Sequence, residues 1–257
     1  MKPGDRVLIT GASGGIGGAI ALACAARGAW PVVAYCSGAE RASALVARCG
    51  RGEARRMDLA ADLDGAPAVE AIVHCAAAYE AEPSLLDAPD ELIAHLLAVN
   101  LLGPLRLTRA VDAATTALKR VVFILSSASF CRGTGPYALS KASELALCRL
   151  LANELAPRGT RVDAIVPGWT ATPMAERAAQ AKGRCLDDIA RQHPDGLLLA
   201  PQDIGELCAA LLFDHADAPP GNLIEWDRRD SADPVWRPLD KMHSAVEVVS
   251  GGSSFAN

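Results

Sequence analysis

Short runs of apolar and β-branched residues alternate along the chain with longer stretches in which apolar residues recur at helical spacing. The runs predict strands over residues 6–10, 32–35, 71–75, 121–125, 162–166 and 223–226, with one more, third in order, that ends at Asp58. Runs of this kind are typical of strands buried on both faces of a parallel sheet. Helices are expected between them, over residues 16–26, 40–48, 91–117, 137–156 and 203–213.

This alternation predicts an α/β fold: a single Rossmann-type, doubly wound domain with a mostly parallel seven-stranded sheet flanked by helices. We expect the domain to span residues 1–227. Residues 58–71 leave room for only a very short helix, so one crossover is expected to be clipped. Residues 174–199 carry mixed charge and are expected to form a mobile lid of helix and loop. Residues 228–257 are expected to form a tail that packs on a neighbouring subunit, crosses the substrate opening or is disordered.

Composition narrows the class of protein. Of 257 residues 51% are hydrophobic and 21% charged, which provides material for a core and gives no sign of global disorder. The net charge is −5, and the 25 basic residues are scattered among 30 acidic ones, which gives nucleic-acid binding little support. The eight cysteines form no C-x-x-C pair, so we expect their thiols to be reduced. With no bilayer-length apolar segment and a strand pattern from the first residues, we expect a soluble, cytoplasmic protein with no membrane partner and no metal.

The turn after the first strand is rich in glycine. It reads Thr10-Gly11-Ala12-Ser13-Gly14-Gly15-Ile16-Gly17 and runs directly into the first predicted helix. Without β-carbons the backbone can approach a pyrophosphate, whose charge the helix N-terminus stabilises. The run therefore indicates a phosphate cradle, although taken alone it is also compatible with a turn that binds no ligand.

A second candidate feature is the pair Tyr137 and Lys141, which lie four residues apart and so share a helix face. A cation beside a phenol favours the phenolate, which makes tyrosine a usable acid or base near neutral pH. Ser126 and Ser127 follow the strand 121–125, at the sheet edge where open α/β folds bind ligands. Each feature has an ordinary alternative, a helix surface or a turn, and only their joint occurrence in this order is informative.

In these features the chain resembles the short-chain dehydrogenase/reductase family, whose members carry TGxxxGxG, a strand-end serine and YxxxK in the same order. The resemblance covers about residues 5–227. It adds Asn100, in the sequence AVNLLGP, as the counterpart of the family's catalytic asparagine, and residues 167–172, PGWTAT, as its PGxxxT segment beside the nicotinamide.

The resemblance implies a hydride transfer between a nicotinamide and a carbonyl or alcohol carbon. Tyr137 would exchange a proton with the substrate oxygen, Ser127 would hold that oxygen, and Lys141 would lower the tyrosine pKa and bind the nicotinamide ribose. Asn100 would support a water-linked proton relay. The expected cofactor contacts are Gly11, Ser13, Gly14, Gly15, Ile16, Gly17, Ser37, Asp58, Leu59, Ala76, Tyr137, Lys141, Pro167, Gly168, Thr170 and Thr172.

The chain departs from the family pattern in three places. The usual NNAG stretch is His74-Cys75-Ala76-Ala77, and His74 is expected to be structural rather than catalytic. Only ten residues separate Ser127 from Tyr137, so the loop over the substrate site is expected to be short. Residues 227–229, DRR, stand where a DGG-like turn is common.

Cofactor choice depends on the end of the second strand, where a carboxylate would bind the adenosine ribose and repel a 2′-phosphate. The run Ala34-Tyr35-Cys36-Ser37 has no carboxylate, and Ser37 or Arg41 could contact a phosphate, which favours NADP(H) over NAD(H). Gly14 does not favour NADP(H), because many NADP-binding relatives carry a basic residue at that position.

The leading hypothesis is an NADP(H)-preferring reductase of a small carbonyl compound that works as a homodimer or homotetramer. A first alternative is reduction of a 3-oxoacyl group on a carrier protein, with Arg132, Arg177 and Arg184 meeting the acidic carrier. A second alternative is a non-catalytic protein that senses NADP(H) or acts as a scaffold.

Overall fold

The computed structural model describes residues 1–61, 63, 65–80, 84–130, 135–214, 221–227 and 233–239. Eight strands of this part of the chain form one sheet in the order β3-β2-β1-β4-β5-β6-β7-β8. The strands from β1 to β7 pair in parallel and β8 pairs antiparallel to β7. Their bounds are β1 Arg6–Ile9, β2 Trp30–Tyr35, β3 Glu53–Arg56, β4 Ala71–His74, β5 Arg120–Ile124, β6 Arg161–Pro167, β7 Asn222–Trp226 and β8 Val235–Pro238.

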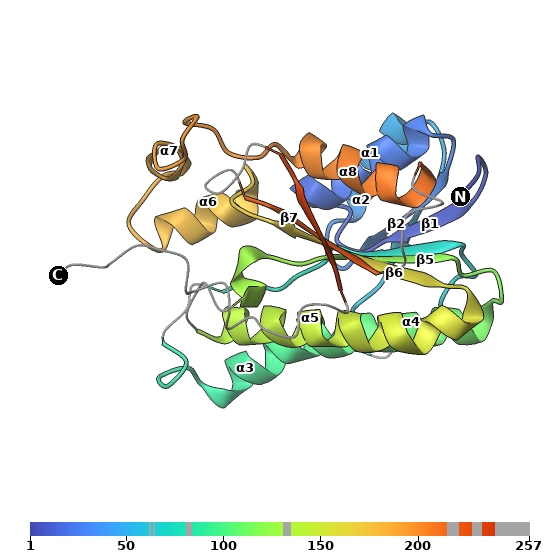
Figure 1. Ribbon diagram of the computed structural model, residues 1–257, viewed down its shortest axis with the longest axis horizontal. Helices are drawn as coiled ribbons and strands as arrows, with labels where there is room; N and C mark the ends of the chain where they lie inside the picture. Colours follow the sequence, from blue (N-terminus) through green and yellow to red (C-terminus); the bar gives the residue numbers. More distant parts are fainter. Residues whose placement is uncertain are drawn as a thin grey trace.

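Helices cover both faces of the sheet (Figure 1). One layer holds α1 (Gly15–Ala26), α2 (Ala39–Cys49) and α8 (Pro201–Phe213), and the other holds α3 (Asp90–Leu97), α4 (Gly103–Ala114) and α5 (Pro136–Leu155). Successive residues of β1 point to opposite faces: Val7 and Ile9 join the core under α1 and α8, whereas Leu8 joins the core under α4 and α5. Two buried faces require an apolar residue at every position, which confirms the doubly wound fold inferred from the continuous runs.

The eighth strand falls inside the segment expected to be a tail. β8 adds to the edge of the sheet along β7, and all four of its residues are exposed. With no buried face, the sequence VWRP carries neither an apolar run nor an alternation, so the count of seven strands was one too low. Residues 228–232, with Arg228 and Arg229, and residues 240–257 lie outside the described residues.

The single helix expected over residues 91–117 is interrupted. α3 ends at Leu97, a π-helical turn follows over Ala98–Leu102, and α4 begins at Gly103. Pro104 has no N–H to donate to the turn before it, and such a residue permits this widening of the helix. No helix occurs in the described part of residues 58–70, as expected for a clipped crossover.

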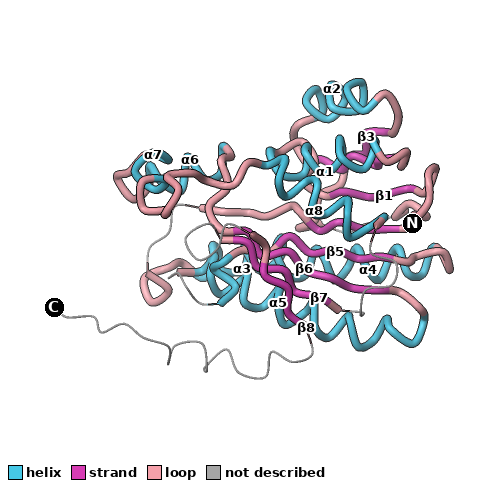
Figure 2. Tube along the Cα trace, turned by 45° about the horizontal axis from the view of Figure 1, so that its top comes forward, coloured by secondary structure: helices cyan, strands magenta, loops and turns pink. Residues whose placement is uncertain are grey.

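The chain order places a ligand crevice. β1 lies between β2 and β4, so the crossovers diverge from the carboxyl end of β1, which is the switch point where open α/β sheets bind ligands. Figure 2 shows α6 (Pro173–Gln180) and α7 (Leu186–Ala190) projecting beyond that end of the sheet. Among the described residues no helix is long and apolar enough to cross a membrane, and the seven cysteines there are all free.

Candidate active site at the carboxyl end of the sheet

The glycine loop closes tightly between β1 and α1. Gly11 has a φ of 64°, in the left-handed region that favours glycine, and its carbonyl oxygen accepts a hydrogen bond of 2.9 Å from the Gly14 amide. A β-carbon on Gly17 would lie 2.6 Å from that same carbonyl oxygen. The loop therefore depends on glycine at both ends, and the first turn of α1 that follows it carries no acidic side chain.

Three segments meet at this loop. The Thr10 hydroxyl accepts hydrogen bonds from the amides of Cys75 and Ala76, at 3.0 and 3.1 Å, and ties the end of β4 to the loop. A β-carbon on Gly15 would lie 2.9 Å from the Thr172 side chain, so the segment after β6 reaches the loop from the other side. A helix N-terminus, a backbone without β-carbons and a first helical turn without acidic side chains together fit the pyrophosphate of a dinucleotide.

Basic and hydroxyl groups gather beyond the end of β2. A β-carbon on Gly38 would lie 3.0 Å from Arg41 Nη2 and 3.1 Å from Ser13 Oγ, so the guanidinium and the hydroxyl flank the same glycine. Arg41 and Ser37 are exposed. The residues expected to decide the cofactor therefore lie next to the glycine loop, and they present donors rather than a carboxylate.

The four residues expected to be catalytic lie on three neighbouring elements at this end of the sheet. Tyr137 is in the first turn of α5 with Lys141 one turn later, and Ser127 begins a 3₁₀ turn, Ser127–Phe130, that packs against α5. The Tyr79 ring contacts the Tyr137 ring edge to face, with centroids 5.3 Å apart. Residues 131–134, including Arg132, lie outside the described residues, so the loop over the site is described only at its two ends.

Lys141 is fully enclosed. Its side chain is 1% exposed, and its ammonium donates to the Ile124 carbonyl at 3.1 Å and to the Glu144 carboxylate. Burial lowers the lysine pKa, but the charge of Glu144, with smaller effects of Tyr137 and of the Glu144 hydrogen bond, more than offsets this, so the pKa lies above its ordinary 10.5. Sequence reasoning missed Glu144, although its position three residues after Lys141 on a predicted helix was a usable signal.

Asn100 occupies the π-helical turn and is fully buried. Its amide nitrogen donates to the Ala78 carbonyl at 3.0 Å and to Ser140 Oγ at 2.9 Å, and its oxygen accepts from the Ala78 amide at 2.7 Å. Ser140 in turn donates to the Tyr137 carbonyl at 2.8 Å. The side chain thus connects the segment after β4 to the first turns of α5, where Tyr137 lies.

His74, which stands where the family has an asparagine, ends β4 in the core. Its Nε2 lies 2.8 Å from Thr108 Oγ1, and its ring packs 4.7 Å from that of Phe123. Burial, with a smaller effect of the nearby Lys141 cation, lowers the His74 pKa from 6.5 to about 3. The neutral, enclosed ring agrees with a structural residue.

The other expected cofactor contacts differ in their exposure and surroundings. Asp58 is exposed and its carboxylate accepts from the Ala60 amide at 3.0 Å, while Leu59 beside it is buried. Gly168 lies against the Asp227 carboxylate, 2.5 Å from where a β-carbon would be. The segment after β6 thus contacts the glycine loop through Thr172, and Gly168 before it is enclosed by Asp227.

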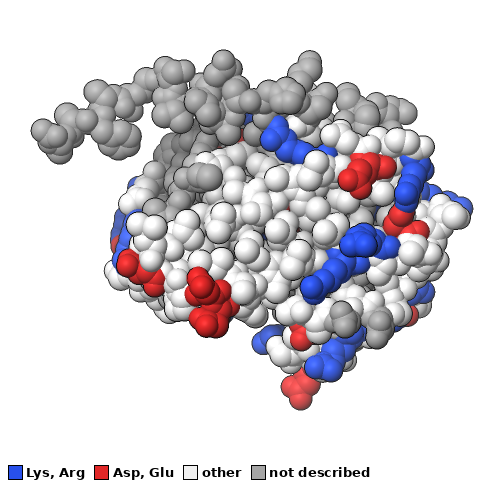
Figure 3. Space-filling view, turned by 90° about the horizontal axis from the view of Figure 1, so that it is seen from below, with Lys and Arg blue, Asp and Glu red and all other residues white. Residues whose placement is uncertain are grey.

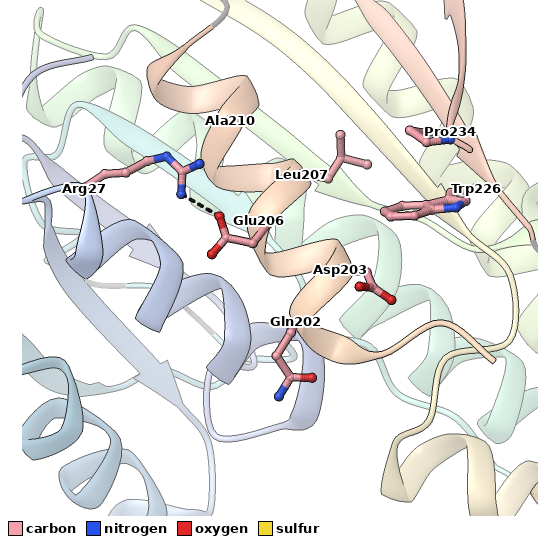
Figure 4. A pocket seen from close by; sticks show the side chains of 8 residues that line it. All are labelled: Arg27, Gln202, Asp203, Glu206, Leu207, Ala210, Trp226 and Pro234. Atoms are coloured by element: carbon pink, nitrogen blue, oxygen red, sulfur yellow. Dashed lines mark hydrogen bonds and ion pairs between the residues drawn. The ribbon is translucent and has the colours of Figure 1, made fainter. Parts of the chain in front are cut away.

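A separate groove lies on the outer side of α8 (Figure 4). It has a volume of about 440 Å³ and is bridged at one end by an ion pair of 2.9 Å between Arg27 and Glu206. None of the residues expected at the active site lines it. The lining residues are Arg27, Gln202, Asp203, Glu206, Leu207, Ala210, Trp226 and Pro234.

Comparisons with known proteins agree with this arrangement. The model of a family described as enoyl-(acyl carrier protein) reductase matches residues 11–228. Oxidoreductase UcpA of Escherichia coli K12 is 32% identical over 236 residues, covering 83% of this chain and 89% of the relative. A short-chain dehydrogenase/reductase, SDR:glucose/ribitol dehydrogenase from Brucella melitensis, superposes with a TM-score of 0.79 at 26% identity, covering 91% of this chain and 100% of that chain. A short chain dehydrogenase from Burkholderia cenocepacia in complex with NADP gives 0.77 at 27% identity, covering 89% and 99%.

Proposed function

Because the chain belongs to the short-chain dehydrogenase/reductase family and is an oxidoreductase of that type, we propose that it reduces a carbonyl group to an alcohol with NADPH. The observation that supports the proposal is that Tyr137 and the buried Lys141 share α5, where the lysine donates to the Ile124 carbonyl at the carboxyl end of β5. A phenol, a fixed cation and a phosphate cradle at one sheet edge are the parts that this chemistry needs.

In the proposed mechanism NADPH, when bound, supplies the hydride to the carbonyl carbon. Tyr137 donates the proton to the carbonyl oxygen, and Ser127 donates a hydrogen bond that holds this oxygen in place. Lys141 stabilises the tyrosinate that remains and hydrogen-bonds the ribose. Asn100 keeps the first turns of α5 in register with the segment after β4 and supports the return of a proton from solvent.

The preference for NADPH rests on Arg41 and Ser13 beside Gly38. A guanidinium forms strong, charge-assisted hydrogen bonds to a phosphate, whereas an NADH ribose offers it no such charge. We expect Arg41→Ala to weaken NADPH binding about tenfold or more and to leave NADH binding unchanged in a fluorescence titration. Arg48→Ala, an exposed arginine farther along α2, is the matched control. Equal loss for both cofactors would contradict the assignment.

We propose that residues 174–199 close over the substrate as a lid. The two ends of this segment are joined where Ala171 donates to the Leu199 carbonyl at 2.9 Å and Leu199 donates to the Trp169 carbonyl at 3.1 Å. The Lys182 ammonium lies 5.9 Å from the centre of the Trp169 ring. A segment held at its base beside the crevice is suited to open and close as one unit.

The reductase proposal is tested by following NADPH consumption with a panel of small ketones for the wild type and for Tyr137→Phe. The variant keeps the ring but loses the transferable proton, so turnover should fall by about 100-fold or more while NADPH binding is retained. Full turnover in the variant would refute the assigned proton donor. Tight NADPH binding without turnover on any ketone would favour the sensing or scaffolding alternative.

Reduction of a carrier-bound acyl group is the second candidate, and the description of the matching family supports it. Its expected docking arginines receive less support. Arg184 donates to the Asp188 carbonyl at 3.0 Å, and Arg177 is exposed near Glu176 on α6. Substrates that differ only in the carrier separate the two candidates, because docking would make the carrier-bound ketone much the better substrate.

We propose a homo-oligomer that forms through the long helices. Figure 3 shows the face formed by α3, α4 and α5, whose middle is largely uncharged with charged residues at its edges. Leu150 is 60% exposed on α5 and Leu139 is 39% exposed near its start. Exposed apolar residues on such a face are typical of an interface. A monomeric mass by light scattering would contradict the proposal.

A further inference from the structure

A second charged group is buried beside the lysine of the proposed site. Glu144 and Lys141 lie on successive turns of α5, and both side chains are 1% exposed. One carboxylate oxygen of Glu144 accepts a hydrogen bond from the ammonium. The other oxygen, Oε1, is buried without a hydrogen-bond partner among the described residues. The mechanism above gives this carboxylate no role.

The position is costly for a carboxylate. Burial raises the pKa of Glu144 from 4.5 to about 7, against the opposing charge and hydrogen bond of Lys141. A buried ion pair is often no more stabilising than apolar side chains of the same volume. A charged pair with one unsatisfied oxygen, next to the proposed proton donor, therefore indicates a role in the reaction rather than in stability.

Neighbouring groups at the carboxyl end of β4 do not balance the lysine charge. His74 is neutral because burial lowers its pKa to about 3, and Cys75 is a neutral thiol because burial raises its pKa to about 12. Cys148, one turn after Glu144 on α5, is likewise a neutral thiol, because burial and nearby carboxylates raise its pKa.

Charged groups on the other elements that pack against α5 either have hydrogen-bond partners or are exposed to solvent. Asp163 on β6 accepts from Arg161 Nε at 2.7 Å and from the Asn222 amide at 2.9 Å. The titratable residues of α3 are exposed to solvent; they are Asp90, Glu91 and His95. The 3₁₀ turn Ser127–Phe130 and the π-helical turn contribute no charge. Among the described residues, Glu144 is thus the carboxylate that meets the lysine.

We propose that Glu144 is a positioning residue that acts through Lys141: it anchors the ammonium at the end of β5 and offsets its charge, so that Tyr137 keeps its proton to higher pH. The inference rests on the proposed function and adds to it a preferred direction of the reaction. Reduction forms a C–H bond from the hydride and an O–H bond from the Tyr137 proton, whereas oxidation needs Tyr137 as the phenolate. A partly neutralised lysine therefore favours reduction at neutral and mildly alkaline pH.

The distance between Glu144 and Tyr137 along α5 sets the size of the effect on the titration of Tyr137. Glu144 is seven residues after Tyr137, a rise of about 10 Å. At about that distance, with an effective dielectric constant of about 20, one unit charge moves a titration midpoint by about one pH unit. In Glu144→Gln the Ile124 carbonyl and the new amide oxygen still accept from the ammonium. The expected result is that of a charged Lys141, whose two remaining hydrogen bonds in this variant oppose the burial that lowers the lysine pKa.

The test measures the ionisation of Tyr137 directly. The chain has three tyrosines, so subtracting the ultraviolet titration of Tyr137→Phe from that of the parent isolates tyrosinate formation at this position. The same difference is measured in backgrounds carrying Glu144→Gln and Glu144→Leu, the second of which leaves no unpaired polar atom if the first fails to fold. Glu154→Gln, an exposed position on the same helix, is the control.

We expect the midpoint of Tyr137 to fall by about one pH unit in the Glu144 variants and to stay unchanged in Glu154→Gln. The pH profile of alcohol oxidation should move to lower pH by the same amount. An unchanged or higher midpoint would overturn the inference. The titration requires neither cofactor nor turnover, so it decides the role of Glu144 even if Tyr137→Phe retains activity and the proposed function fails.

Discussion

Replacing Asn100 should destabilise the protein by an amount that its hydrogen bonds define. The buried side chain makes three of them, two to Ala78 and one to Ser140, between 2.7 and 3.0 Å. Each contributes about 1 kcal/mol net, so Asn100→Ala should lower the free energy of unfolding by about 3 kcal/mol. For a domain of this size the loss corresponds to a melting temperature about 6–12 °C lower.

Thermal unfolding of the protein without cofactor, followed by circular dichroism, measures this loss. Asn100→Asp separates hydrogen bonding from volume, because it keeps the acceptor for the Ala78 amide but turns an oxygen toward the Ala78 carbonyl. It should be at least as destabilising as the alanine variant. Asn153→Ala, exposed on α5, controls for loss of an asparagine. A melting temperature for Asn100→Ala within about 2 °C of the wild type would refute the reasoning.

Three further predictions follow from the geometry. Gly17→Ala places a β-carbon 2.6 Å from the Gly11 carbonyl oxygen. The affinity for NADPH, measured by fluorescence titration, should therefore fall at least about tenfold. An unchanged affinity would contradict the close approach. Because burial lowers the His74 pKa from 6.5 to about 3, only the unfolded state binds a proton at this residue in that pH range. Lowering the pH should therefore reduce the free energy of unfolding by up to about 1.4 kcal/mol per pH unit. Urea unfolding of His74→Gln should show a flatter acid dependence, and an equal slope would contradict the buried neutral ring. Asp163→Ala leaves Arg161 buried without its carboxylate and should cost about 3–5 kcal/mol, which a near-normal urea midpoint would disprove.

The sheet was predictable because its strands are buried on both faces. Val7, Leu8 and Ile9 are all fully buried, and that requirement is written in the sequence as an unbroken apolar run. β8 leaves no such trace, because its four residues are exposed and it joins the sheet by backbone pairing with β7. Edge strands without a buried face are therefore the part of this fold that residue patterns do not predict.

Within the candidate site, spacing along one helix was informative and contacts between elements were not. Tyr137 and Lys141 could be paired from their separation, and the same rule applied to Glu144 would have found the counter-ion. The contacts of Asn100 with Ala78 and Ser140 join three segments through a π-helical turn, whose widening no local pattern signals. Such long-range hydrogen bonds emerge only when the chain is folded.

The central claim is hydride transfer from NADPH to a carbonyl carbon with Tyr137 as the proton donor. Its most direct test uses NADPH deuterated at the transferring position, with a ketone panel and mass spectrometry of the alcohols. The account predicts deuterium on the carbinol carbon of the product with the wild-type protein and almost none with Tyr137→Phe. Alcohol formed without deuterium, or equal labelling by both proteins, would contradict it.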